Sequence, residues 1–277
     1  MYRPSHYTCV PSSPSARSRS LYASLALFAC LVAFASAADA ATFTVTTTSD
    51  TGAGSLRAAV AAAAASAGAD TINFAIPAAS CDAVTGRCTI ALASEIVMDA
   101  TGGALTINGT GAHLLTIDAG PGTNRIFYSF SGATLTLTGM TLTGGNGVGG
   151  AGQFSDLGGA IYLRASTLVL DGVHVTGNSA PVGGGVYLFQ GISHQIFNST
   201  FSSNTSGNCG AFMMDSTEIV VGNTTVSGNT ASSSGGGVCV NGFANVTLRN
   251  LTIASNTAGR EAAGSTTRQG RPGWAAP

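Results

Sequence analysis

Carboxylates are the side chains with the clearest chemical potential in this chain, and they are few. Asp215 and Glu218 lie three residues apart, and Asp156 lies in a long glycine-rich stretch. Carboxylates cleave glycosidic bonds or hold calcium when several of them meet at a fixed separation. We interpret these three as solvated turn residues or, alternatively, as an isolated ion or ligand site.

A histidine and two tyrosines are further candidates. His194 falls within an apolar alternation, as either a buried general base or a structural histidine. Tyr162 and Tyr187 occupy equivalent places in two similar phrases; such a pair either stacks on sugar rings or packs across strands. No Ser-His-Asp arrangement, phosphate loop or zinc spacing is present, so we assign no catalytic residue, metal site or cofactor.

A repeat of about 26 residues must position these groups. Four glycine-rich phrases carry apolar anchors at intervals of 25, 26 and 26 residues: Ile161, Val186, Phe212 and Val238. Four asparagines recur at intervals of 26, 25 and 27 residues: Asn178, Asn204, Asn229 and Asn256. Because two independent sets of residues recur with the same spacing, the sequence contains an internal repeat.

Each repeat alternates with the period of a β-strand. Glycine and asparagine separate the apolar runs, where turns need left-handed backbone. Because a unit this short cannot fold alone, we expect the units to stack as a parallel β-helix with coils ~4.8 Å apart. Two columns then point inward: Ile161, Val186, Phe212 and Val238, and Leu163, Leu188, Met214 and Val240. Tyr162, Tyr187, Met213 and Cys239 face outward, and the four asparagines form an amide ladder.

The phrase Gly158-Gly159-Ala160-Ile161, with a β-run ending in Asn178-Ser179-Ala180, resembles the repeats of polymorphic outer-membrane proteins. More broadly, residues 105–258 resemble right-handed β-helix proteins of the pectate-lyase-like superfamily. This resemblance implies an all-β fold, a single-stranded right-handed parallel β-helix. The superfamily includes adhesins, autotransporter passengers and polysaccharide lyases, so the fold does not select one activity.

Residues 1–41 have the organisation of a secretory signal peptide. Arg17 and Arg19 precede an apolar run at 21–35 and then a series of small residues. A retained membrane anchor is the alternative. The β-helix domain then spans 42–258, with its regular repeats at about 105–258.

A capping helix is expected at about residues 55–67, where Ser55 is a suitable N-cap for an alanine-rich run. We expect Leu56 and Val60 to seal the first coil and Arg57 to stay in water. The Ser-Leu-Arg-x-Ala kernel at 55–59 resembles the amino-terminal cap of a family named for its Cys-Ser-Leu-Arg-Glu-Ala motif. Gly54 and Ala58 replace the Cys and the Glu of that motif.

Four cysteines follow the predicted leader. Cys81 and Cys88 lie in a turn-rich insertion, and an oxidising compartment favours a disulfide between them over a metal site, which would need more ligands. Cys209 and Cys239 fall four register positions apart on adjacent coils. We expect both to be reduced, because this separation is too large for a disulfide.

Charge excludes one class of partner. Only 8% of the residues are charged, and region 42–258 carries five Arg against eight Asp and two Glu, a balance of 5 − 10 = −5. With no basic cluster, no nucleic-acid partner is expected. No segment after the leader is apolar enough for a membrane helix, so no integral membrane domain is expected. Residues 259–277 lack apolar alternation, and we expect them to be disordered or outside the pattern.

The sequence therefore predicts a secreted or cell-surface β-helix protein, adhesin-like and non-enzymatic. It would act as an adhesion or recognition scaffold for cell-surface glycans or proteins. The alternative is a carbohydrate-active enzyme of the same fold, either a polysaccharide lyase or a hydrolase. A truncated gene product is a third alternative, because the repeat pattern breaks after Asn256.

Overall fold

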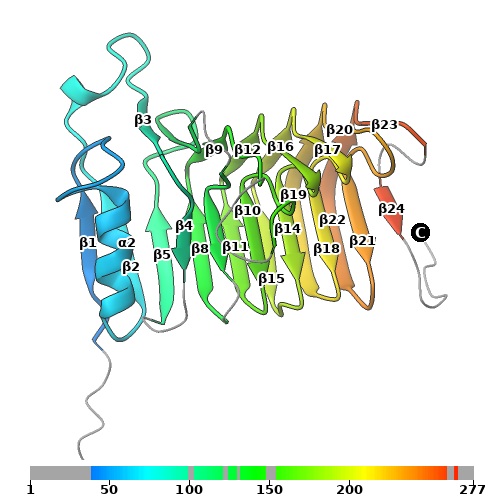
Figure 1. Ribbon diagram of the computed structural model, residues 1–277, viewed down its shortest axis with the longest axis horizontal. Helices are drawn as coiled ribbons and strands as arrows, with labels where there is room; N and C mark the ends of the chain where they lie inside the picture. The colour runs from blue at the N-terminus through cyan, green and yellow to red at the C-terminus, as the bar shows by residue number, and fades with distance from the viewer. Residues whose placement is uncertain are drawn as a thin grey trace, which may run out of the picture. The chain divides into compact units, whose positions relative to one another are not determined.

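The computed structural model describes residues 39–98, 103–120, 124–129, 132–147 and 154–260, and the backbone of 265–267. Over these residues the chain forms a parallel β-solenoid whose coils contribute strands to three sheets (Figure 1). The predicted signal peptide lies outside the described residues, except for 39–41.

Sheet B, which carries the candidate site, gains one strand from each coil after the first. Its strands, in order along the stack, are β4 (Ile96–Met98), β7 (Phe127–Ser129), β10 (Ile161–Arg164), β14 (Val186–Phe189), β18 (Phe212–Asp215), β21 (Val238–Asn241) and β24 (Ser265–Thr267). The last of these adds one strand to the sheet within 259–277, where we expected the pattern to stop.

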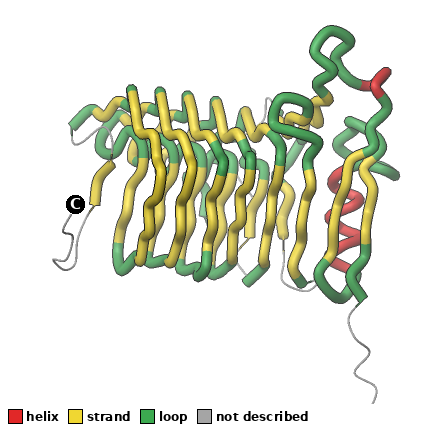
Figure 2. Tube along the Cα trace, turned by 180° about the vertical axis from the view of Figure 1, so that it is seen from behind, coloured by secondary structure: helices red, strands yellow, loops and turns green. Residues whose placement is uncertain are grey.

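Sheet A forms two sides of the solenoid, joined through the long strands β19 (Glu218–Ser227) and β22 (Asn245–Ala254). One side contains β1 (Thr42–Val45), β2 (Asp70–Phe74), β5 (Ala104–Asn108), β8 (Thr134–Thr138), β11 (Thr167–Asp171) and β15 (His194–Phe197). The other contains β3 (Cys88–Ala91), β6 (Leu115–Asp118), β9 (Thr141–Thr143), β12 (His174–Thr176) and β16 (Thr200–Ser202). Figure 2 shows these strands stacked side by side from behind.

The smaller sheet C closes each later coil. It consists of β13 (Ser179–Val182), β17 (Thr205–Asn208), β20 (Thr230–Ala231) and β23 (Thr257–Ala258). All pairings between the described strands are parallel, so equivalent residues of successive coils lie next to one another.

The predicted inward columns are confirmed. Ile161 pairs with Val186, Val186 with Phe212 and Phe212 with Val238, and all four side chains are at most 1% exposed. The second column pairs in the same register. Alternation explains this arrangement, because every second residue of a strand faces the same side. Burying each such side chain contributes on the order of 1.5–3 kcal/mol.

The asparagine ladder is also confirmed. The Nδ2 atoms of Asn178, Asn204 and Asn229 each donate to the Oδ1 of the next asparagine, at 3.0, 2.9 and 2.9 Å. Each Nδ2 also donates to a carbonyl of an earlier strand, such as Val175 O for Asn204. Each Oδ1 therefore accepts from an amide side chain and from a backbone N–H, which satisfies the polar groups of a buried corner.

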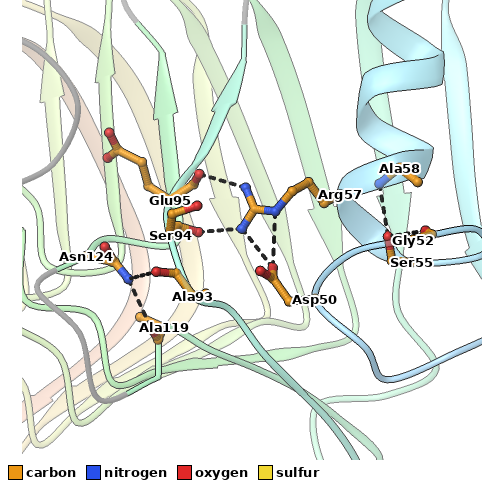
Figure 3. A network of polar contacts seen from close by, with 10 residues as sticks. All are labelled: Asp50, Gly52, Ser55, Arg57, Ala58, Ala93, Ser94, Glu95, Ala119 and Asn124. Carbon is orange, nitrogen blue, oxygen red and sulfur yellow. Dashed lines mark hydrogen bonds and ion pairs between the residues drawn. The ribbon is translucent and has the colours of Figure 1, made fainter.

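Helix α2 (Leu56–Ala65) contacts the first two strands and caps the core. Ser55 is the N-cap, its Oγ accepting from the Ala58 N–H, and Leu56 and Val60 are buried as expected. The expectation that Arg57 stays in water holds only in part, because its side chain is 26% exposed but its guanidinium is paired. Its guanidinium binds Asp50 through two nitrogens and donates to the carbonyls of Ser94 and Glu95 (Figure 3). Arg57 therefore links the helix to the segment that precedes β4.

The insertion between β2 and β3 contains one short 3-10 helix, Ala78–Ser80. As predicted, Cys81 and Cys88 are joined by a disulfide, and their Cα atoms lie 4.2 Å apart. The Asp82 carboxylate accepts from the backbone of Val84 and Thr85 in the intervening turn. These bonds from Thr85 and Val84 lower the pKa of Asp82.

Candidate functional site

The outer face of sheet B brings three of the predicted ligand-binding residues together. Tyr162 and Tyr187 stand in register on neighbouring coils, followed by Met213 and Cys239. Two positions further along each strand, a second outward column contains Arg164, Phe189, Asp215 and Asn241. We call this second column the outer row of sheet B. Asp215 therefore lies beside the tyrosines, although it is distant from them in the sequence.

The tyrosine column is covered. The rings of Tyr128 and Tyr162 lie 5.7 Å apart between centroids, and those of Tyr162 and Tyr187 lie 5.5 Å apart. Phe154, from a neighbouring loop, packs on Tyr162 at 5.6 Å. Tyr162 is only 1% exposed and Tyr187 only 8%. The two rings point away from the core but do not form an exposed platform for sugar rings.

Burial determines how these tyrosines titrate. It raises the pKa of Tyr162 to about 12, with Arg164 acting in the opposite direction. Burial, reinforced by the Asp215 carboxylate, also raises the pKa of Tyr187. Both phenols therefore keep their protons at neutral pH and do not act as bases, and the Tyr187 hydroxyl is a hydrogen-bond donor.

Arg125 holds one end of the tyrosine column. Its Nε lies 3.3 Å from the Glu95 carboxylate, and the guanidinium lies over the rings of Tyr128 and Tyr162 at 5.0 and 5.4 Å. It also donates to the carbonyls of Gly147 and Phe154. Its side chain is 1% exposed, and burial lowers its pKa while Glu95 favours the charged form. Desolvating an ion pair is unfavourable unless other polar contacts accompany it; here two carbonyls accept from one guanidinium nitrogen, and two ring faces lie beside the cation.

The sequence interpretation missed Arg125 and Glu95. The only signal in the sequence is that each charged residue stands directly before an apolar strand, at Ile126-Phe127 and at Ile96-Val97. That position places a side chain at the corner of a coil, next to the buried interior.

The outer row is partly exposed and chemically mixed. Arg164 lies over the rings of Phe154 and Phe189, at 5.2 and 5.6 Å from their centroids. The Oδ2 of Asp215 accepts from the Tyr187 hydroxyl at 3.1 Å and from Asn241 Nδ2 at 3.0 Å. Its Oδ1 accepts from Ser216 Oγ at 3.0 Å. The row thus offers a cation, a ring face, a carboxylate and an amide on four successive coils.

Glu218 and Asp156 lie at the margins of this face. Glu218 begins β19 and is exposed; Ser216 and Thr217 separate it from Asp215 at one corner, as expected. Asp156 is exposed in the loop before β10, and its φ of 80° is left-handed. Among the residues that the structure describes, no group of three or more His, Cys, Asp or Glu side chains could hold a metal ion.

His194 has a structural position. Its side chain is 1% exposed, it pairs with Ile219, and its Nδ1 accepts from the Leu168 N–H at 2.9 Å. Burial lowers its pKa to about 4, so the ring is neutral near pH 7. The outward His174 is half-buried and its Nε2 lies 2.8 Å from Ser202 Oγ. Burial and Arg87 both lower the pKa of His174.

The prediction that Cys209 and Cys239 are reduced is wrong, because a disulfide joins them with a Cα–Cα distance of 5.6 Å. Four register positions separate two side chains this far only where the chain between them is extended. Cys209 instead has a φ of 67°, and its equivalents Gly183 and Gly235 have φ values of 66° and 68°. This left-handed corner turns the Cys209 side chain over Met213, with 3.3 Å between the two sulfur atoms. Cys239 is the partner of Met213 on the next coil, so the bond spans a single coil step.

Comparison with known proteins identifies the architecture. The family described as "Right handed beta helix region" matches residues 158–268. No curated protein shows significant similarity to the chain. With the strand pairings above, this match shows an all-β, right-handed parallel β-helix repeat protein. No helix within the described residues is long and apolar enough to cross a membrane.

Proposed function

We propose that this right-handed β-helix protein is exported and serves as an adhesion or recognition scaffold at or beyond the cell surface. The observation that carries the proposal is the outer row of sheet B, where Arg164, Phe189, Asp215 and Asn241 stand on successive coils. The four strands that carry this row, β10, β14, β18 and β21, are each paired on both sides, and their core positions are buried, so the row is held rigid.

The chemistry of the row suits glycans or polar protein surfaces. Phe189 is partly exposed, with Arg164 over one face of its ring, and offers an apolar contact to a sugar or to a side chain. Arg164 and Asn241 offer N–H donors, and Asp215 is a preorganised acceptor whose orientation three hydrogen bonds fix. Coils repeat at ~4.8 Å, so an extended ligand running along the stack would meet a different group at each step.

Export is supported by the cysteines. Disulfides join both cysteine pairs of the described chain, Cys81 with Cys88 and Cys209 with Cys239. Disulfides persist in oxidising compartments and are rare where glutathione keeps thiols reduced. This agrees with the signal peptide expected at residues 1–41.

The enzymatic alternative would use the Tyr187–Asp215 pair, in which a candidate acid and base are hydrogen-bonded on this face. A lyase needs a base that removes a proton near neutral pH. The raised pKa of Tyr187 opposes that role, and Asp215 is already committed to three donors. We therefore favour binding over catalysis.

The test measures binding of the mature protein to a glycan array and to intact cells. Phe189→Ala and Arg164→Ala remove groups of the outer row, and Gln195→Ala, on the exposed face of sheet A, is the matched control. We expect each row variant to bind at least about tenfold more weakly, the loss of one good contact, and the control to bind normally. Binding that is equal in all three variants, or no binding at all, would refute the proposal.

Catalysis is tested with the same preparations. They are incubated with pectin and with alginate, and unsaturated uronate is followed by its absorbance. Lyase activity that Tyr187→Phe abolishes would favour the enzyme instead.

A further inference from the structure

The last complete coil exposes residues whose equivalents in the coils just before it are core. Leu248 is 44% exposed, whereas Val221 and Ile196, at the same position of the two preceding coils, are fully buried. Ile253 is 36% exposed, whereas Val226 and Phe201 are fully buried. The sequence keeps large apolar residues where only another layer of chain would remove them from water.

Within the part of the chain that the structure describes, the strand that carries them has one edge without a partner strand. Among the described strands, β22 pairs with β19 alone, over almost its whole length. Sheet B does not end at the same level, because β24 adds one more strand beside β21. At this end of the solenoid β24 therefore stands one strand higher than the neighbouring part of sheet A. We call β24 the raised strand, and residues 245–248 of β22, one strand lower, the ledge.

The corner between the raised strand and the ledge is the turn 242–244, and its Phe243 is 86% exposed. β21 runs toward this corner and β22 runs away from it. A two-fold axis through the corner would place the β24 of one copy on the ledge of another, with the paired strands antiparallel. The same operation would bring the two Phe243 side chains together at the axis.

We infer that this end of the solenoid is an interface with a second copy of the chain, formed by placing each β24 on the other's ledge. The raised strand and the ledge are self-complementary, as an isologous interface requires. The contact would continue the coil-to-coil stacking of the interior, pairing the open edge of β22 and covering Leu248. Growth beyond a dimer is blocked, because α2 covers the core at the other end with Leu56 and Val60.

The experiment measures the mass of the mature full chain by light scattering and sedimentation over a thousandfold concentration range. Leu248→Arg and Phe243→Ser are the test variants, and Ile192→Ser, 68% exposed on another turn, is the control. Circular dichroism checks that each variant is folded. We expect a dimer for the wild type and the control, and at least about a hundredfold weaker dimerisation for Leu248→Arg, as for the loss of a central apolar contact.

Three outcomes would overturn the inference. The first is a wild-type chain that is monomeric throughout, and the second is a dimer that neither variant weakens. The third is a monomer that becomes a dimer only when residues 268–277 are deleted, because the chain's own end would then be the occupant of the ledge. Glycan binding by the outer row is measured separately, so failure here leaves the proposed function standing.

Discussion

The Tyr187 hydroxyl donates a hydrogen bond of 3.1 Å to the Asp215 carboxylate, which lies on the next coil of sheet B. The two residues are 28 positions apart in the sequence. The bond runs diagonally between neighbouring strands and connects the buried tyrosine column to the partly exposed outer row.

Removing this bond should have a modest effect on stability. Tyr187→Phe deletes only the hydroxyl, and Asp215 keeps its bonds from Asn241 and Ser216. We expect the free energy of unfolding to fall by about 1.5–3 kcal/mol, the net value of a hydrogen bond to a charged group. Guanidinium unfolding measures the change. Tyr162→Phe, which keeps the stacked ring, is the control, and equal losses in the two variants would contradict this role for the bond.

The asparagine ladder should contribute far more stability from its middle than from its end. Asn204→Ala removes the acceptor of Asn178 and the donor to Asn229, and it leaves the buried Val175 carbonyl without the Asn204 amide. Unsatisfied buried groups cost about 1–3 kcal/mol each, so we expect a total loss of about 3–5 kcal/mol. Asn256→Ala, at the less buried end, should lose less than half of this. Similar unfolding midpoints for the two variants would contradict the prediction that the middle of the ladder contributes more stability than its end.

His194 should make the fold sensitive to acid. Its pKa falls from about 6.5 in the unfolded chain to about 4 in the fold, so the unfolded state binds the proton more tightly. Above pH 6.5 the imidazole is neutral in both states, and no stability is lost to its protonation. As the pH falls from 6.5 toward 4, the unfolded state takes up the proton and the folded state does not, so the free energy of unfolding falls by on the order of 3 kcal/mol. His174, whose pKa is also lowered, adds to this in the same direction.

His194→Leu removes the titrating group from an apolar column, although the Leu168 N–H loses its acceptor. We therefore expect the variant to be less stable than the wild type at pH 7 but to lose less stability between pH 7 and pH 4.5. Urea unfolding at both pH values, with His174→Leu alongside, measures the slopes. Parallel pH profiles for the wild type and His194→Leu would exclude the buried imidazole as their origin.

The Cys209–Cys239 disulfide should stabilise the chain more than Cys81–Cys88. The two bonds close loops with sequence separations of 30 and 7 residues. Loop entropy gives roughly 3–4 kcal/mol for the first and roughly 2 kcal/mol for the second. Replacing each pair by serine and comparing unfolding free energies tests the order. Peptide mapping without reduction tests the pairing, and alkylation of Cys209 and Cys239 in the native oxidised protein would contradict it.

Much of the fold could be predicted from the sequence, because in a solenoid the repeat length determines which residues of adjacent coils are neighbours. A constant coil length places Ile161 beside Val186 and Asn204 beside Asn229, and alternation decides which side chains are buried. The capping helix followed from Ser55 and an alanine-rich run. The same spacing placed Asp215 in the outer row beside Phe189, but it gave no measure of exposure.

Only the tertiary structure decided where side chains point at the corners of the coils and which outward side chains are covered by loops. Left-handed backbone at Cys209 brings its sulfur to Cys239, although counting positions along an extended strand separates them. Phe154 and Arg125 come from other segments and cover the tyrosines that alternation had left facing outward. Asp50 likewise comes from a different segment than Arg57, and its ion pair with Arg57 could not be read from the repeat. Periodicity fixes contacts between equivalent residues of neighbouring coils, whereas turn dihedrals and contacts between unrelated segments depend on the folded path of the whole chain.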